Sequence, residues 1–412
     1  MRSPSVPRRV ALTAIAGALL LTSEAAAAKT TDYIDLEAGL GFSTNPFLQL
    51  HSHSTAFGRI SAYGVHSWQT EKGSTTLTGY VENTTYFKDY GSKQIFDLGA
   101  HTNQAVSPTV TLFGDLDFSG DFAGQLSNRL LTVPSQPVVP VPGNPLPQPT
   151  TNPDLLGFTG RQYRASADVG ASIRSGARGT ISLSAGAQRS WFTGGNRDAD
   201  YNSYFGTVGY SQQVSERTSA GASVQFQRQD FSHGDWANIV NPVVTLHTQL
   251  TESMVADAAV GVMYIQQRTS GFKDHQVTPS VSGSLCNVGN NSRFCVRVSR
   301  DAQSALSARI LNGAGGAAVT TIAGVDYYRR LSEKETIQAS LNATRYDTPG
   351  AINGFRIRTT YFSGIVGYDR KVGNRIYAGV SGGARKLFQD GPDPKLDFNA
   401  NVYLRYRLGD LL

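Results

Sequence analysis

Helical patterns and long apolar runs are both scarce in this sequence. The only long apolar run is Val10–Thr22, and no stretch after residue 30 repeats apolar residues with the period of an amphipathic helix. A soluble protein of 412 residues would usually show such helices beside its strands. A helical membrane protein would need apolar stretches of about 20 residues. These absences exclude a helical membrane protein and disfavour an ordinary soluble fold.

Residues that carry catalysis or bind metals are few and scattered. The seven histidines are spread over predicted strands and loops, and no Ser/His/Asp constellation stands out. His51 and His53 could share a metal ion, but two histidines without a third ligand are more often plain loop residues. We therefore expect no catalytic residues, no metal site and no cofactor.

The N-terminal segment 1–28 has the layout of a cleaved secretory signal. Arg8 and Arg9 precede the apolar run Val10–Thr22, and the small residues Ala25–Ala28 follow it. Loss of this segment removes three arginines and Glu24, so the formal charge falls from +6 to +4. Such a mild, evenly spread charge does not indicate nucleic acid as a partner, and we expect none. Residues 29–412 are then the mature, exported part.

Glycine and aromatic residues are abundant, with 43 Gly, 18 Tyr and 19 Phe. From Tyr33 onward, polar and apolar residues alternate in stretches of about 10 to 14 residues, the length of a tilted membrane-spanning strand. The last stretch is the clearest, because even-numbered positions from Leu396 to Leu408 are apolar and most odd-numbered ones are polar. Ile34–Phe42 and Tyr163–Ile173 repeat the pattern. This period of two predicts strands with one apolar and one polar face.

The connections between these stretches alternate between two kinds. Short polar connections such as Ser107-Pro108 and Ser215–Arg217 alternate with longer ones such as Thr44–Ser54, Gln267–His275 and Asp301–Gly316. Short periplasmic turns and longer extracellular loops are typical of outer-membrane barrels. The pattern predicts an all-β, transmembrane antiparallel barrel of about 18 strands, with both ends in the periplasm. A soluble propeller, with shorter strands, is the alternative.

The connection at about 119–160 is rich in proline. Between Val133 and Pro153 it holds eight of the 17 prolines, so it cannot be a strand. We place it outside the cell, as a disordered loop or as a stiff lid over the pore, and composition does not decide between the two.

If the apolar faces meet lipid, the polar faces line a hydrated lumen, because barrels of roughly 16 to 18 strands leave an aqueous channel unless plugged. Their mixed charges either neutralise one another or form a path for a ligand. Inward arginines would attract anions, although inward aspartates keep that bias weak. The candidate lumen residues are Asp35, Glu37, Asp115, Asp117, Arg164, Asp168, Arg174, Arg405 and Arg407.

Cys286 and Cys295 lie symmetrically about the predicted inner turn Asn287–Ser292. Two cysteines facing each other across a hairpin of an exported protein predict a disulfide. Nothing resembles a Cys-x-x-Cys motif, so a structural role is favoured over a redox role.

Three segments carry a resemblance to a known family: Gly39–Pro46, Ser299–Ile310 and Tyr327–Glu333. There the chain resembles the β-barrel porin type 2 family of exopolysaccharide biosynthesis and export loci, including the barrels of sphingan-type gum clusters. The resemblance implies an outer-membrane portal for secreting an exopolysaccharide. Its implied partners are a periplasmic polysaccharide export protein and an inner-membrane co-polymerase.

Two other functions stay open: a diffusion porin for small solutes, and an enzyme at the outer rim. A docking surface facing the periplasm would favour the portal. A constriction folded inward, together with a trimer, would favour the porin. A Ser/His/Asp cluster at the outer rim would favour the enzyme.

Overall fold

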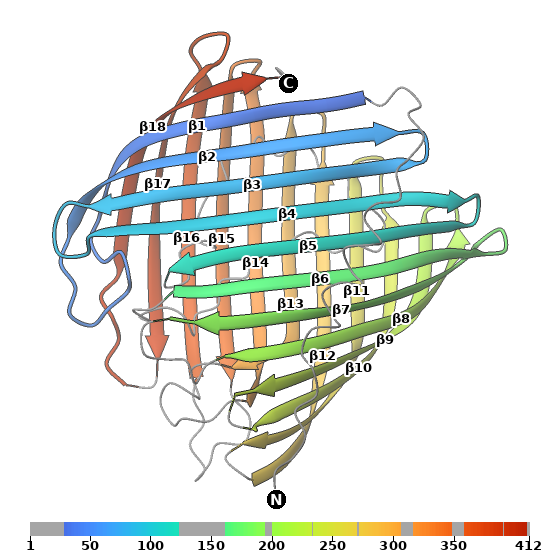
Figure 1. Cartoon of the computed structure of the whole chain (residues 1–412). Coiled ribbons are helices and arrows are strands. Elements are labelled where there is room, and N and C mark those ends of the chain that lie inside the picture. The colour runs from blue at the N-terminus through green and yellow to red at the C-terminus, as the bar shows by residue number, and fades with distance from the viewer. Residues whose placement is uncertain are drawn as a thin grey trace, which may run out of the picture.

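The chain forms one closed barrel of antiparallel strands (Figure 1). The structure, a computed structural model, describes residues 29–122, 161–193, 200–232, 234–269, 272–305, 316–347, 358–389 and 391–409. Within these ranges all regular secondary structure is strand, and no helix could cross a bilayer. The predicted signal segment 1–28 lies outside the described residues.

Eighteen strands make up the barrel, as the alternation predicted. They are β1 (Lys29–Ser43), β2 (Thr55–Thr70), β3 (Gly73–Tyr86), β4 (Ser92–Ser107), β5 (Val110–Phe122), β6 (Arg161–Ser175), β7 (Gly179–Phe192), β8 (Tyr201–Ser215), β9 (Thr218–Phe231), β10 (Trp236–Gln249), β11 (Met254–Thr269), β12 (Phe272–Val288), β13 (Ser292–Ala305), β14 (Gly316–Ser332), β15 (Glu335–Asp347), β16 (Arg358–Lys371), β17 (Ile376–Gln389) and β18 (Asp397–Gly409).

Every strand pairs with both of its neighbours along at least part of its length, which closes the sheet. Strand β1 closes the barrel by pairing with β2 on one side and with β18 on the other. The closing register runs from Tyr33 opposite Gly409 to Ser43 opposite Asn399. A closed sheet satisfies all its backbone groups internally, which is the condition for crossing a membrane with strands.

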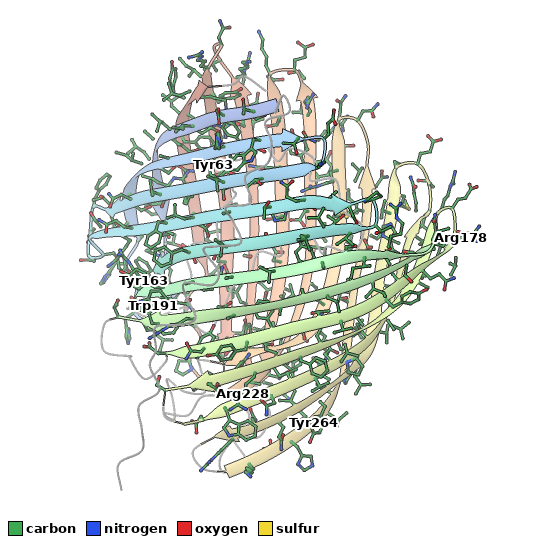
Figure 2. All side chains as sticks on the ribbon, turned by 45° about the vertical axis from the view of Figure 1, so that its right-hand side comes forward. Tyr63, Tyr163, Arg178, Trp191, Arg228 and Tyr264 are labelled. Atoms are coloured by element: carbon green, nitrogen blue, oxygen red, sulfur yellow. A yellow bond between two sulfur atoms is a disulfide. The ribbon has the colours of Figure 1, made fainter. Side chains whose placement is uncertain are left out.

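The outer face of the barrel is apolar and the inner face is polar. Ile60 on β2 and Val244 on β10 are 69% and 66% exposed, whereas the alternate positions Asp35 and Glu37 on β1 are buried. Figure 2 shows the side chains that stand out from this surface, Tyr264 and Arg228 among them. Because apolar side chains point outward all round the barrel, its outer face fits lipid.

The connections at the two ends of the barrel differ in length. At one end, here called the turn end, the connections have two to four residues. At the other, the loop end, they range from two residues at 270–271 to 38 in segment 123–160, and most are longer than four. This confirms the predicted asymmetry. Strand β5 runs to Phe122, and the remainder of the predicted Pro-rich loop lies outside the described residues.

The predicted outer loop Gln267–His275 is wrong, because β11 runs to Thr269 and β12 begins at Phe272. Gln267 is buried on the inner side, whereas Arg268 and Lys273 are exposed on the outer side. Beyond the lipid region both faces of a strand can be polar. The alternation in hydrophobicity therefore ends before the strand does.

The predicted disulfide is confirmed. Cys286 on β12 lies directly opposite Cys295 on β13, and their sulfurs are bonded. Both residues are buried, at 4% and 1% exposure, on the inner face near the turn end.

Candidate functional site: the barrel lumen

The strand register shows on which face each predicted lumen residue lies. In β1, β5, β6 and β18 the large apolar side chains occupy alternate positions on the outer face. All nine candidates occupy the intervening positions on the inner face: Asp35, Glu37, Asp115, Asp117, Arg164, Asp168, Arg174, Arg405 and Arg407.

The charges near the closing seam are paired and buried. Arg407 makes two hydrogen bonds to Asp35, of 2.7 and 2.6 Å, and Arg405 pairs with Asp369 on β16. Glu37 pairs with Arg59 on β2. The two arginine side chains of β18 are only 3% and 1% exposed. Because they are buried and paired, these two of the four predicted lumen arginines offer little positive charge to a solute. The predicted attraction of anions then depends on Arg164 and Arg174 alone.

A second group of charges, more exposed to the lumen, lies on β4, β5 and β6. Asp115 is directly opposite Asp168 and contacts His101, while Arg164 lies 3.5 Å from Asp117. The side chains of Asp115 and Asp117 are 41% and 30% exposed. Asp97 on β4 adds a further carboxyl group beside Asp117. This acidic wall, formed by Asp97, Asp115, Asp117 and Asp168, places net negative charge beside the lumen.

The inner face of β7, β8 and β9 carries no charged side chain, and these three strands are described throughout. Serine, threonine and glutamine alternate there with small residues and a few aromatics. Gln227 donates to Ser203 at 3.0 Å, and Gln188 donates to the Tyr201 hydroxyl at 3.1 Å. This neutral wall can exchange hydrogen bonds with polar solutes without attracting ions of either sign.

The loop end of the β13–β14 hairpin leaves the wall and lies inside the barrel. Pairing between β12 and β13 stops where Val281 faces Arg300, although both strands continue. Arg300 then donates to Thr278 on the inner face of β12 at 3.3 Å. Farther along, Ala302, Ala317 and Val319 form one buried cluster with inner-face residues of β10 and β11, namely Ala237, Ile239, Met263 and Ile265.

A hydrogen bond fixes the position of this infolded hairpin. The backbone N–H of Ala317 donates to Oε1 of Gln267 on β11 at 2.9 Å. The opposite face of β14 is covered as well, because Ala318 packs on Tyr346 of β15. The infolded hairpin, residues 301–305 and 316–320, therefore occupies part of the barrel's cross-section.

The prediction of a plain outer loop at Asp301–Gly316 is wrong at its two ends, which are strands of the infolded hairpin. Residues 306–315 between them lie outside the described residues. The sequence did contain one signal, because Ala317, Ala318 and Val319 are consecutive apolar residues that break the alternation. Such a run predicts a strand covered on both faces.

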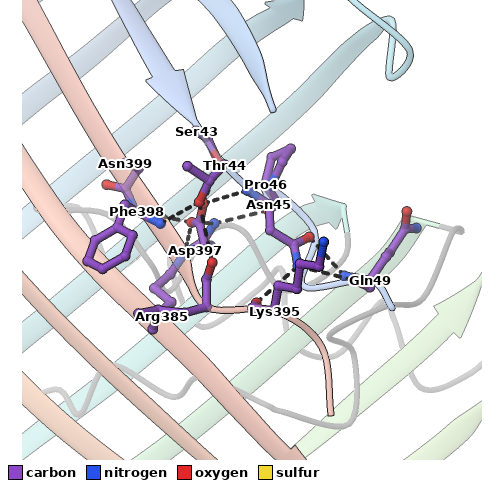
Figure 3. Close-up of polar contacts among 11 residues, drawn as sticks. Ser43, Thr44, Asn45, Pro46, Gln49, Arg385, Lys395, Asp397, Phe398 and Asn399 are labelled. Carbon is purple, nitrogen blue, oxygen red and sulfur yellow. Dashed lines mark hydrogen bonds and ion pairs between the residues drawn. The ribbon is translucent and has the colours of Figure 1, made fainter. Parts of the chain in front are cut away.

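A second segment also enters the lumen at the loop end, immediately after β1. Asp397 at the start of β18 accepts hydrogen bonds from the Ser43 hydroxyl at 2.6 Å and the Asn45 N–H at 2.8 Å (Figure 3). Arg385 on β17 donates to the same carboxylate at 2.9 Å and to the Pro46 carbonyl at 3.1 Å. The carboxylate and guanidinium thus hold the chain where it leaves β1.

Asn45 shapes the turn that follows. Its amide donates to the carbonyls of Gln49 and Lys395, and its side-chain oxygen accepts from the Gln49 N–H at 3.0 Å (Figure 3). Leu48 is thereby held at φ 50°, a conformation that few residues other than glycine adopt. Its side chain is buried against Tyr361 and Leu387 on the inner face of β16 and β17. Asn45 and Pro46 therefore anchor this inward turn, residues 44–49.

Several residues of the site were missed from the sequence. Arg385, Asp397, Asp369 and Arg59 occupy inward positions of their strands and carry charge, so strict use of the alternation could have found them. Their pairing could not be found that way, because partners such as Ser43 and Asp397 are 354 residues apart. Among the described residues no group of three or more His, Cys, Asp or Glu is placed to hold a metal ion.

Comparisons with known proteins give structural matches only. No family model and no curated protein matches the sequence. The structure is similar to OccAB3 of Acinetobacter baumannii, with 7% identity, 92% of this chain and 100% of that chain covered, and a TM-score of 0.42. It is also similar to Pseudomonas aeruginosa OccK2 in complex with glucuronate, with 9% identity, 93% of this chain and 99% of that chain covered, and a TM-score of 0.45. A third similar structure is the FrpB iron transporter of Neisseria meningitidis, with 7% identity, 92% of this chain and 83% of that chain covered, and a TM-score of 0.45.

Similarity at this level carries no inference about function, and the barrel's own features decide its location. A closed antiparallel barrel with an apolar outer face, an even number of strands and short turns at one end is the architecture of bacterial outer-membrane proteins. The chain is an outer-membrane β-barrel. Its turn end then faces the periplasm and its loop end faces outward.

Proposed function

We propose that this barrel is a diffusion pore for small polar solutes. The observation that supports it is the infolded hairpin, which lies against the inner face of β10 and β11. The inward turn 44–49 lies against β16 and β17 in the same way. Barrels of this strand number enclose a wide channel. Two inward segments narrow it from different sides, as a size filter requires.

The wall chemistry indicates which solutes would pass. The neutral wall of β7, β8 and β9 offers hydroxyl and amide groups, which suit uncharged polyhydroxylated solutes. The acidic wall raises the local concentration of cations and lowers that of anions. We therefore propose neutral and cationic solutes as the preferred class.

Export of a polysaccharide, with a periplasmic export protein and an inner-membrane co-polymerase, is the alternative that the family resemblance implies. A polymer would have to thread past both inward segments along its whole length. The two functions also differ in what they need, because a diffusion pore conducts alone and a portal works with partners. Purified protein in a planar bilayer therefore tests the proposal directly.

Two shortened variants isolate the effect of the infolded hairpin. Ala302 lies directly opposite Val319, and Ala305 lies directly opposite Gly316, so a two-residue Asn-Gly turn can close the hairpin at either level. Replacing residues 303–318 removes most of the infolded hairpin, whereas replacing 306–315 keeps it. We expect the first variant to raise single-channel conductance roughly twofold over the second, because conductance grows with the open cross-section.

Liposome swelling with sugars of increasing size gives the second measurement. The parent should admit small sugars and reject larger ones, and the 303–318 variant should shift that limit upward. A parent barrel that neither conducts nor admits any sugar would contradict the proposal and favour the portal. Equal conductance of the two variants would show that the hairpin is not the constriction.

A further inference from the structure

The outer face of the barrel carries a band of cations at the loop end of β6 to β12. These positions are on the outer face because each lies an even number of residues from an exposed apolar or aromatic side chain of the same strand, such as Phe226, Tyr264 or Val277. The acid facing outward in this part of the described strands is Asp230, and Arg228 already binds it at 2.9 Å. The cations of this band are Arg161, Arg189, Arg228, Arg268 and Lys273.

Two of these cations are placed directly opposite each other. Arg268 on β11 faces Lys273 on β12, and both side chains are exposed. Neither makes an ion pair with an acid of the described chain. Like charges directly opposite each other destabilise a sheet, so this pair favours an anion bound between them.

Aromatic side chains border the band. Trp236 lies directly opposite Arg268. The Arg228 guanidinium lies 5.8 Å from the centre of the Trp236 ring. Tyr264, 43% exposed, is four residues nearer the lipid belt than Arg268 on the same strand. Aromatic girdles mark the membrane interface in outer-membrane barrels. The cations therefore stand at the level of lipid headgroups.

The turn end of the same strands is different. Within the described strands β6 to β12, the outward positions nearest the turns carry no charge, as at Ile181, Val214 and Leu285. The turns that connect these strands hold Arg178 and Arg217 together with Glu216 and Glu252, so their formal charges sum to zero. Figure 2 shows Arg178 at one end of the barrel and Trp191 with Tyr163 at the other. The charge is thus confined to the end that meets the outer leaflet.

We propose that this band, centred on Arg268 and Lys273, binds the phosphorylated headgroup of a glycolipid of the outer leaflet, such as lipid A. Arginine forms paired hydrogen bonds with phosphate and lysine contributes a point charge. The exposed apolar side chains below would meet the acyl chains of the same molecule. This binding is independent of what passes through the lumen.

The test is titration of the detergent-purified full chain with bisphosphorylated lipid A, followed by native mass spectrometry. The double variant Arg268→Gln/Lys273→Gln should bind roughly tenfold more weakly, because two charge-assisted contacts are lost. The matched control, Arg178→Gln/Arg217→Gln, removes the same charge at the turn end and should bind like the parent. Arg268→Lys keeps the charge and should retain most of the affinity, and heat-modifiable mobility on a gel checks that each barrel is closed.

Three results would overturn the proposal. One is equal affinity of the parent and the loop-end double variant. Another is equal binding of lipid A stripped of its phosphates, since the acyl chains alone would then account for it. The third is displacement by inorganic phosphate at a similar concentration, which would make this a site for free phosphate.

Discussion

Arg407 lies against Asp35 across the seam between the last and first strands, 372 residues apart in sequence. The guanidinium makes two hydrogen bonds to the carboxylate, of 2.7 and 2.6 Å, and the ring of Tyr33 lies 4.4 Å from it. Both charged side chains are almost fully buried, at 1% and 5% exposure. The pair therefore joins the first strand to the last strand where the barrel closes.

Removing one partner of this pair should destabilise the barrel. In Arg407→Met the Asp35 carboxylate stays buried without its partner, which typically costs about 3–5 kcal/mol. Urea unfolding in detergent micelles, followed by tryptophan fluorescence, would measure the loss. Replacing both residues, as Arg407→Met with Asp35→Leu, should restore much of it. Arg174→Met, at an exposed inner-face position near the turn end, is the control, and a loss as large as that of Arg407→Met would refute a special role for the seam.

Neutralising Asp397 should release the inward turn 44–49. Leu48 is 1% exposed, so a cysteine introduced by Leu48→Cys should react slowly with a maleimide. Adding Asp397→Asn weakens the contact of Arg385 with residue 397 and so with the inward turn. The reaction should then be roughly tenfold faster, which corresponds to a loss of about 1.4 kcal/mol in the free energy of opening the turn. Asp393→Asn makes the same change at an exposed site in the adjacent connection and should have no effect. Unchanged labelling by Asp397→Asn would mean that apolar packing alone holds the turn.

The acidic wall should give the pore a preference for cations. Asp115 on β5 lies directly opposite Asp168 on the adjacent strand β6. Replacing both with asparagine removes two lumen charges. The ratio of potassium to chloride permeability, taken from the reversal potential in a salt gradient, should fall roughly twofold. Asp32→Asn makes the same chemical change on the outer face of β1 and serves as the control. An anion-selective parent would contradict this reading of the wall.

The disulfide should stabilise the β12–β13 hairpin without affecting conduction. It closes a short loop, with a sequence separation of 9, so its loss should cost about 2–3 kcal/mol. Cys286→Ser/Cys295→Ser should lower the unfolding midpoint while single-channel conductance stays within error of the parent. Mass spectrometry of unreduced peptides should show the link directly. Free thiols in protein taken from the cell envelope would contradict it.

The Pro-rich segment should be exposed on the cell surface. It connects β5 to β6 at the loop end, where insertions are best tolerated. A tag inserted at Gly143 should be labelled on intact cells, and a tag in the turn after Ser215 only after the outer membrane is broken. The reverse result would invert the assignment of the two ends.

The sequence alone determined the strands and their two faces. Alternation is a local property, so Ile34 to Phe42 and Leu396 to Leu408 identify outward positions without any knowledge of partners. The same local reasoning placed Asp35 and Arg407 on the inner face and paired Cys286 with Cys295, because a hairpin turn fixes the register on either side of it. The lengths of the connections then separated the two ends of the barrel.

Only the tertiary structure decided which inward groups meet and where the wall bends. Asp35 and Arg407 became partners because closure aligned β1 with β18, and the contact between Asp397 and the inward turn has the same origin. The infolding of the β13–β14 hairpin depends on packing against β10 and β11, which lie more than 30 residues away in sequence. Local periodicity holds no information about such long-range contacts, since it records which face a residue takes and not what covers that face.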